Sequence, residues 1–302
     1  MRYFKLQNAD GDIISITTDE ILFHDISGLG FEEDNTFRSV GPVWRLSKSS
    51  INQLPVEGKL CFTENGSTTP YEKYEFFKTF ITKPPLILIY YPHGIAGKEY
   101  HKKVRVSKLV KTELTEYGVL DSDVAFMPYT PWYEIRRYEI TPIPIDENAG
   151  WIWDVGNSWD RPDSDTTSPR YKFGTGARNI ISFDCGSNTK GFIKLTINGP
   201  AVNPIWTHHV NGTLVETGGF EENSNVILTD HDKLVIDSTD GQYSMTITDI
   251  QTRVVRNVYS IRDFDKECFF TIEEGTNRIM VTSADEATLS VELEGHFHYA
   301  TV

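Results

Sequence analysis

Two histidine pairs are the side chains of this sequence best suited to bind a metal. His296 and His298 are two positions apart, a spacing that places both imidazoles on one face of a β-strand. Continuing the apolar alternation from Leu293 puts both on the solvent-facing side, unless a bulge at Gly295 reverses the register. The neighbours His208-His209 would point to opposite faces, and no third ligand lies at a motif spacing. We therefore predict no metal site.

Four tryptophans could form a carbohydrate-binding surface, because flat aromatic rings stack on sugar rings while polar neighbours bond the hydroxyl groups. They are Trp151, Trp153, Trp159 and Trp206. The same residues could serve only as packing in the domain core and its loops, and packing is the favoured interpretation. A carbohydrate-binding, lectin-like β-sandwich is kept as the alternative function.

Catalytic motifs are absent from the sequence, which contains no G-x-S-x-G, no H-E-x-x-H and no G-x-x-x-x-G-K-[ST]. The fragment Gly174-Thr175-Gly176 precedes no helical pattern, so it does not qualify as a dinucleotide loop. Carboxylate pairs such as Glu221-Glu222 and Glu273-Glu274 are common in an acidic segment, and the sequence places no pair across a cleft as a glycosidase requires. We predict no enzyme and no cofactor, with a glycoside-active enzyme as the weakest alternative.

Charge is distributed unevenly along the 302 residues, which carry a formal net charge of −14. Residues 1–145 have a net charge of −2, whereas residues 146–302 have a net charge of −12. A nucleic-acid surface needs clustered Lys and Arg, so the second half argues against specific nucleic-acid binding. The one basic run, His101–Lys111, fits the solvated face of a strand.

The start of the chain, MRYFKLQNADGD, lacks the pattern of a secretory signal, and the longest apolar run, Leu86–Tyr91, is too short to span a bilayer. We therefore expect synthesis and folding in a cytosol, without membrane insertion. The three cysteines, Cys61, Cys185 and Cys268, are far apart and form no C-x-x-C pair. We predict buried free thiols.

One helix is predicted over about residues 70–82. Thr69 can cap it, Pro70 suits its first position and Glu72 completes a capping box. An aromatic and aliphatic stripe follows at helical spacing, and Pro84-Pro85 ends the pattern. The stripe is typical of a helix that covers one side of a sheet.

The rest of the first half reads as β structure. A hairpin is predicted from Tyr3–Leu6 and Ile13–Ile16 around the Asp10-Gly11 turn, and a looser segment over Gly28–Asn35. Further extended stretches are expected at 43–46, 56–63, 86–91, 102–111, 119–127 and 132–141, with a turn at Asn65-Gly66.

The second half predicts an antiparallel β-sandwich or jelly roll, with no second convincing helix after residue 150. Its clearest strand carries Ile193, Leu195 and Ile197 on one face and polar residues on the other. The same alternation recurs at Tyr243, Met245 and Ile247, and at Leu289, Val291 and Leu293. Such regularly spaced strands separated by turns are typical of a sandwich.

A domain boundary is predicted at Thr141–Ile145, where alternating prolines favour an extended linker. The charge distribution changes at the same place. We expect an N-terminal domain over residues 1–142, a β-sandwich or barrel-like fold with the single helix, and a C-terminal β-sandwich over residues 143–302.

Three sequence segments of the second half, taken together and in this order, resemble one known protein family. They are GFIKLTINGPAVNPIW from Gly191 to Trp206, DKLVIDS from Asp232 to Ser238 and EEGTNRIMV from Glu273 to Val281, before a final alternating strand. The first half is similar as well, with its hairpin, its single helix and a strand entered through Pro131-Trp132-Tyr133. The chain resembles the distal tail (Dit) proteins of siphophages over nearly its whole length.

This resemblance implies a non-enzymatic component of the phage tail tip, or baseplate, with a place in the virion and no catalytic residues. It implies a homo-hexameric ring formed by the N-terminal domains, which joins the tail tube protein to the tail-associated hub protein. It further implies that the C-terminal domain is galectin-like and, in some members, anchors receptor-binding proteins. Phage-derived tailocins share the architecture.

Overall fold

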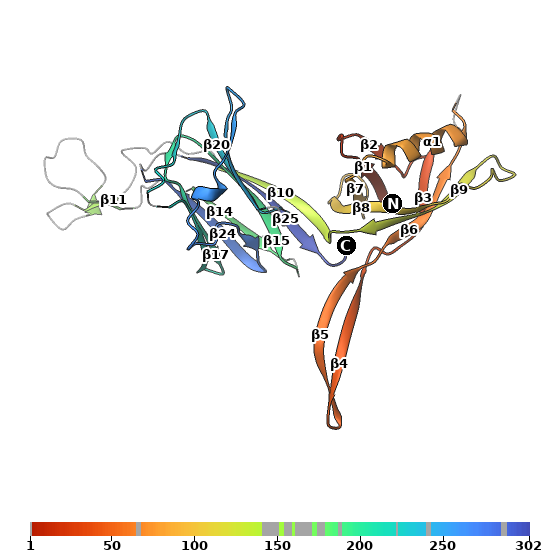
Figure 1. The fold of residues 1–302 in the computed structure, drawn as a ribbon, viewed down its shortest axis with the longest axis horizontal. Coiled ribbons are helices and arrows are strands. Elements are labelled where there is room, and N and C mark those ends of the chain that lie inside the picture. Colours follow the sequence, from red (N-terminus) through yellow and green to blue (C-terminus); the bar gives the residue numbers. More distant parts are fainter. Residues whose placement is uncertain are drawn as a thin grey trace. The chain divides into compact units, whose positions relative to one another are not determined.

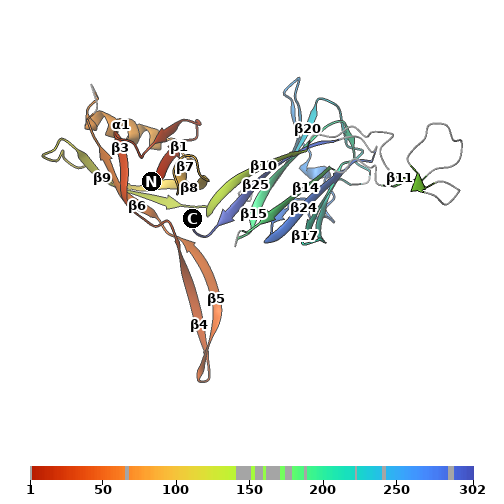
Figure 2. The same ribbon diagram turned by 180° about the vertical axis from the view of Figure 1, so that it is seen from behind.

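The computed structural model shows a mainly β protein with one α-helix and several antiparallel sheets (Figures 1 and 2). It describes residues 2–64, 68–140, 179–186, 189–221, 223–239, 243–284 and 289–302, and the backbone alone of 151–153, 159–160 and 171–173. The predicted linker at 141–145, the Asn65-Gly66 turn and the fragment at 174–176 lie outside these residues.

The chain divides into two compact units. Unit 1 comprises Met1–Ile135, Ser187–Thr189 and Phe297–Val302, and unit 2 comprises Arg136–Gly186 and Lys190–His296. The chain passes from one unit to the other inside β10 (Trp132–Ile140) and inside β25 (Ser290–Tyr299). The predicted division into domains 1–142 and 143–302, with their assigned roles, stays a prediction.

Unit 1 contains two strand series that meet at β8. The first has the order β2-β1-β7-β8-β10 and the second the order β3-β6-β9-β8. The strands are β1 (Tyr3–Gln7), β2 (Ile13–Ser15), β3 (Ile21–Ser27), β6 (Val56–Phe62), β7 (Leu86–Tyr91), β8 (Tyr100–Leu109) and β9 (Leu120–Pro128). The predicted N-terminal hairpin is confirmed, with β1 and β2 antiparallel and Gly11 at a φ of 85° in the turn.

Helix α1 (Pro70–Ile81) is confirmed together with its capping box. The Thr69 hydroxyl accepts from the backbone N–H of Glu72, and the Glu72 carboxylate accepts from the backbone N–H of Thr69. Tyr74 and Phe77 bury their rings against Phe62 of β6, with ring centroids 5.8 and 6.0 Å away. The helix therefore covers a sheet, as its aromatic stripe predicts.

The basic run at residues 101–111 departs from the prediction of a solvated strand face. His101 and Lys102 are buried, although most of the later residues of the run are exposed or partly exposed. The first residues of β8 are covered on both faces of the sheet, because the ring of Tyr133 lies 5.5 Å from that of His101 and the Trp132 ring lies over the ammonium group of Lys102. Strand alternation fails as a guide where both faces of a sheet are packed.

Unit 2 contains two main antiparallel sheets, in the orders β10-β25-β15-β20-β21-β22 and β14-β24-β17-β18. Their strands are β14 (Asn179–Cys185), β15 (Gly191–Asn198), β17 (Ile205–Val210), β18 (Thr213–Gly218), β20 (Asp232–Asp237), β21 (Ser244–Asp249), β22 (Val255–Asn257) and β24 (Gly275–Thr282). Shorter strands are β11 (Trp151–Trp153), β12 (Trp159–Asp160), β13 (Tyr171–Phe173), β16 (Ala201–Val202), β19 (Ile227–Leu228) and β23 (Thr271–Ile272), and a 3₁₀ turn covers Tyr259–Ile261.

The predicted alternation in unit 2 is confirmed for the central strands. Ile193, Leu195 and Ile197 of β15 are buried, as are their apolar counterparts on β20, β21 and β25. Tyr243 is the exception, because it precedes β21 and is 53% exposed. The cysteines are free thiols, of which Cys185 and Cys268 are buried and Cys61 is only partly so.

Candidate functional site

The most exposed element of unit 1 is a long hairpin made of β4 (Phe31–Val40) and β5 (Val43–Gln53) (Figure 1). Among the described strands, β4 and β5 pair only with each other. Almost every residue of both strands is exposed. The predicted loose segment Gly28–Asn35 is therefore wrong from Phe31 onward. The signal that could have found the hairpin is the Gly41-Pro42 turn, where Gly41 has a φ of 65°.

Near its tip the hairpin has an apolar face. Phe37 lies directly across from Leu46, and Ser39 lies across from Trp44. These side chains share one face because residues alternate along a strand and paired residues face the same side. Trp44 is 70% exposed, and Phe37 and Leu46 are each more than half exposed. Large apolar side chains gathered on one surface are a mark of an interaction site.

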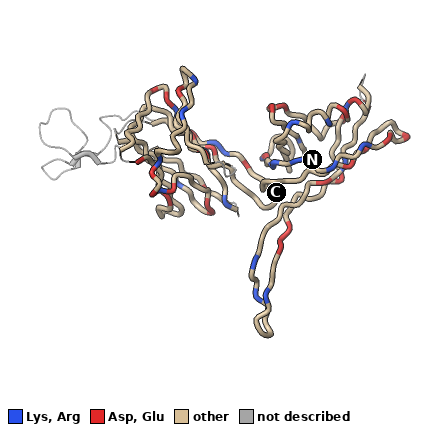
Figure 3. Tube along the Cα trace, viewed as in Figure 1, with Lys and Arg blue, Asp and Glu red and all other residues tan. Residues whose placement is uncertain are grey.

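The opposite face of the tip carries two like charges. Arg38 lies directly across from Arg45, and no ion pair of either residue is present in the described part of the chain. Like charges directly opposite each other destabilise a pair of strands. Acidic residues, Glu32, Glu33 and Asp34, lie at the base of β4. Figure 3 shows the blue segments toward the tip of the hairpin and the red segments toward its base.

The predicted histidine positions need a correction. His296 and His298 are 8% and 4% exposed, so the prediction that both face solvent is wrong. The register runs through Gly295 without a bulge, and the cause is instead that both faces of β25 are covered at its end. In unit 1 the ring of Tyr133 lies 6.1 Å from that of His298. Within the described residues, no three His, Cys, Asp or Glu side chains form a group that could hold a metal.

His208 belongs to a buried polar cluster between β17, β18 and β24. The side-chain amide of Asn277 donates to the carbonyl oxygens of Glu273 and Gly275, at 2.7 and 3.0 Å. Its Oδ1 is therefore the acceptor, and the Nε2 of His208 donates to it at 2.9 Å. The Nδ1 of His208 lies 3.8 Å from the carboxylate of Glu216. This cluster fixes the orientation of the imidazole inside unit 2.

The four candidate tryptophans do not come together as a described site. The side chains of Trp151, Trp153 and Trp159 lie outside the described residues, although β11 and β12 contain these positions. Trp206 is fully buried, and its indole N–H donates to the carbonyl oxygen of Cys268 at 3.0 Å. This burial agrees with the packing interpretation of Trp206. Sugar contact by the other three stays a prediction.

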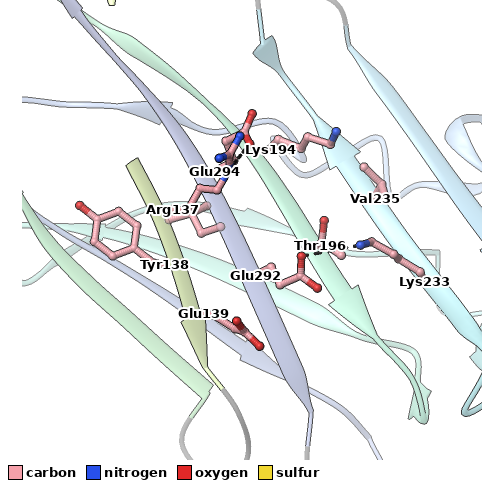
Figure 4. Close-up of a pocket in the computed structure, with 10 residues that line it drawn as sticks. Arg137, Tyr138, Glu139, Lys194, Thr196, Lys233, Val235, Glu292 and Glu294 are labelled. Atoms are coloured by element: carbon pink, nitrogen blue, oxygen red, sulfur yellow. Dashed lines mark hydrogen bonds and ion pairs between the residues drawn. The ribbon is translucent and has the colours of Figure 1, made fainter. Parts of the chain in front are cut away.

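A groove of about 360 Å³, lined mainly by charged side chains, lies on one face of the first sheet of unit 2 (Figure 4). Four neighbouring strands line it, namely β10, β25, β15 and β20. Six charged side chains surround it: Arg137, Glu139, Lys194, Lys233, Glu292 and Glu294. Sequence reasoning missed this groove, because it depends on which strands become neighbours in the sheet.

Glu294 is held in place at one end of the groove. The Nε of Arg137 lies 2.8 Å from one carboxylate oxygen, and the Nε2 of His296 lies 3.2 Å from the other. Partial burial alone would raise the pKa of Glu294, but the hydrogen bonds from Arg137 and His296 outweigh it and lower the pKa. Glu294 is therefore a fixed carboxylate that can accept hydrogen bonds.

Comparisons with known proteins agree with this architecture. Residues 3–129 match the family model described as the distal tail protein, N-terminal domain. A chain of the phage P2 baseplate in its activated conformation with Ca has the same fold, with a TM-score of 0.64, 17% identity and 100% of both chains covered. The crystal structure of SPP1 Dit gives a TM-score of 0.59 at 9% identity, covering 97% of this chain and 98% of that one. A search of curated protein sequences found no match.

These matches define a structural protein of phage tail baseplates. Its N-terminal domain belongs to the distal tail protein family, and the shared fold extends over the full length. The prediction of a non-enzymatic distal tail (Dit) protein at the tail tip of the virion is thereby confirmed. As a baseplate component it assembles with other tail proteins. The described residues contain no helix with the length and hydrophobicity of a membrane span.

Proposed function

We propose that six copies of this chain form a closed ring that joins the tail tube protein to the tail-associated hub protein. In this proposal the N-terminal domain, residues 1–142, forms the ring. The C-terminal domain, residues 143–302, is a galectin-like β-sandwich outside the ring that offers an attachment surface to receptor-binding proteins. The observation that carries the proposal is the exposed β4–β5 hairpin.

An isolated two-stranded hairpin is only marginally stable in water. The β4–β5 hairpin pairs with no other described strand and exposes Phe37, Trp44 and Leu46 on one face. Burying such a surface against another chain would stabilise both the hairpin and the assembly. Since every copy carries the same hairpin, the same head-to-tail contact can be repeated around an axis, and it closes into a ring when the rotation between neighbouring copies divides a full turn.

The charges of the β4–β5 hairpin support a second copy of this chain as the partner that covers it. Arg38 and Arg45 face each other at the tip, while the acidic cluster Glu32, Glu33 and Asp34 lies at the base. An arrangement that brings the tip of one hairpin near the base of the next would pair opposite charges and relieve the Arg38–Arg45 repulsion. The near-neutral first half of the chain also suits close packing of subunits.

Light scattering coupled to size-exclusion chromatography tests the proposal. A hexamer has six times the protomer mass of 34.4 kDa, about 206 kDa, and electron micrographs should show rings with a central hole. Trp44→Asp should dissociate the ring, since it places a charge in the apolar contact. Tyr117→Asp is the matched control, because Tyr117 is an exposed aromatic residue outside the hairpin. A wild-type protein that stays monomeric at every concentration, or a ring that survives Trp44→Asp, contradicts the proposal.

A further inference from the structure

The groove on the sheet of unit 2 has a balanced set of charges. Three of its side chains are cationic and three are anionic. Two ion pairs are already formed (Figure 4). Arg137 pairs with Glu294 on the neighbouring strand at 2.8 Å, and Lys233 of β20 reaches across β15 to Glu292 of β25 at 3.7 Å. The groove as a whole is therefore close to neutral while presenting many strong donors and acceptors.

Two lining side chains of opposite charge have no ion-pair partner among the described residues. In the described part of the chain, Glu139 of β10 and Lys194 of β15 form no ion pair, although Glu294 lies directly across from Lys194 in the sheet. Arg137 and His296 already bond the carboxylate of Glu294. Strand β25 lies between β10 and β15, so the strands that carry Glu139 and Lys194 are about 10 Å apart, which is two strand spacings. One acceptor and one donor thus lie on opposite sides of β25.

The floor between them is also polar. Thr196 of β15 is a lining residue that is only 5% exposed, and it lies directly across from Glu292 of β25. Glu292 accepts a hydrogen bond from the side-chain amide of Asn198 at 3.1 Å. These contacts fix the position of the Glu292 carboxylate without using all of its acceptor sites. The groove therefore has two fixed carboxylates on β25 and one cationic side chain on each of β10, β15 and β20.

We infer that this groove is a binding site for a neutral saccharide, with Glu139 and Lys194 bonding hydroxyl groups at its two ends. A hydroxyl group donates one hydrogen bond and accepts others, so a row of hydroxyls matches alternating carboxylates and ammonium groups. The volume of about 360 Å³ lies within the range of small-ligand sites. The inference concerns unit 2 and does not depend on the proposed ring.

Other ligand classes fit less well. Three carboxylates would repel a strongly anionic ligand, and three cations would repel a strongly cationic one. An apolar ligand would leave the six charged groups of the groove desolvated without partners. A zwitterionic peptide is the strongest competitor, since it could reach both Glu139 and Lys194.

Saturation-transfer NMR on the full chain tests this inference. The ligands are lactose and maltose as free sugars and dextran as a neutral polymer. They are used at concentrations on the order of 10 mM, because a small open site binds weakly. Glu139→Gln and Lys194→Met should each weaken binding by about tenfold, the effect of losing one charge-assisted hydrogen bond. Binding of dextran alone, lost in both variants, also supports the site and assigns it to a polymer rather than a free sugar.

Matched controls are Glu221→Gln and Lys98→Met, which change the same residue types outside the groove. Both should bind sugar as the wild type does, and circular dichroism should show that all four variants are folded. Saccharide binding is refuted if no sugar binds, or if binding persists in both groove variants. If glycylglycine binds and no sugar does, the ligand is a zwitterionic peptide and the saccharide inference is wrong. If the protein is monomeric and still binds sugar, the saccharide site stands although the ring proposal fails.

Discussion

The Nζ of Lys102 lies 4.7 Å from the centre of the Trp132 ring and is fully enclosed in the core of unit 1. It has no hydrogen-bond partner in the described part of the chain. Burial lowers the pKa of Lys102 from its ordinary value to about 8, because the surroundings disfavour the charged form. The attraction of the ammonium to the indole ring offsets only part of this cost.

Replacing this lysine should stabilise the protein. We expect Lys102→Met to raise the free energy of unfolding by about 1 to 3 kcal/mol at pH 7, since it removes a buried charge and keeps the aliphatic stem. The folded-state pKa lies below the unfolded one, so wild-type stability should rise as the pH increases from about 8 toward the unfolded pKa. The stability advantage of Lys102→Met over the wild type should become smaller over the same pH range. Urea unfolding of both proteins at pH 7 and pH 10 would measure this change.

Lys59→Met is the control for this prediction, because Lys59 is exposed on β6 of the same unit. It should change stability little and should show no comparable change between the two pH values. A Lys102→Met protein that is less stable than the wild type at pH 7 would mean that the ammonium has a stabilising partner.

Gly218 allows Trp206 to pack in the core of unit 2. A Cβ added at Gly218 would lie 2.1 Å from the indole nitrogen, and Trp206 lies directly across from Gly218 in the sheet. Gly218→Ala should displace the ring and break its hydrogen bond to Cys268, costing about 2 kcal/mol or more. Tryptophan fluorescence should shift to the red as solvent reaches the indole, whereas Gly212→Asn, in an open turn at positive φ, should leave the emission unchanged.

Asn277 stabilises the buried polar cluster around His208. It is fully buried, and its amide group bonds Glu273, Gly275 and the imidazole. Asn277→Leu should destabilise the protein by about 3 kcal/mol or more, because it leaves several buried polar groups without partners. Thermal unfolding would show the loss, and Asn223→Leu at an exposed position of the same unit should not reproduce it.

The capping box of α1 makes a separate prediction for unit 1. Thr69→Ala should lower stability by about 1 kcal/mol, and Thr69→Ser should restore most of it because serine also caps. The hydrogen bonds from Thr69, chiefly from its backbone N–H, lower the pKa of Glu72. These hydrogen bonds contribute fully to the free energy of unfolding above the pKa that Glu72 has in the unfolded chain. The contribution is lost as the pH falls through the pKa of Glu72 in the folded protein. Urea unfolding of the three proteins at neutral and acidic pH measures both effects, and an equal stability of the alanine and serine variants would count against the cap.

Local patterns predicted the regular parts of both units. The capping residues before α1 and the alternation in β15 depend on neighbours within a few positions, so the sequence contains the needed information. The order of the three C-terminal sequence segments was specific enough to indicate the family.

Predictions that depended on one solvated face of a strand were wrong at Lys102, His296 and His298. In each case residues distant in the sequence cover the second face, as Trp132 covers Lys102 and Tyr133 covers His298. The groove was missed for the same reason, because its residues come from strands that are up to 157 positions apart in the sequence.

The sequence by itself determined the class of fold, the single helix, the family resemblance and the alternation of the central strands, because these follow from short-range periodicity and turn chemistry. Only the tertiary structure decided that β4 and β5 form an exposed hairpin with apolar and cationic faces at its tip, and that Glu139 and Lys194 flank one groove. Strand pairing brings distant residues together, and the free energy that selects one pairing is a property of the whole packed unit.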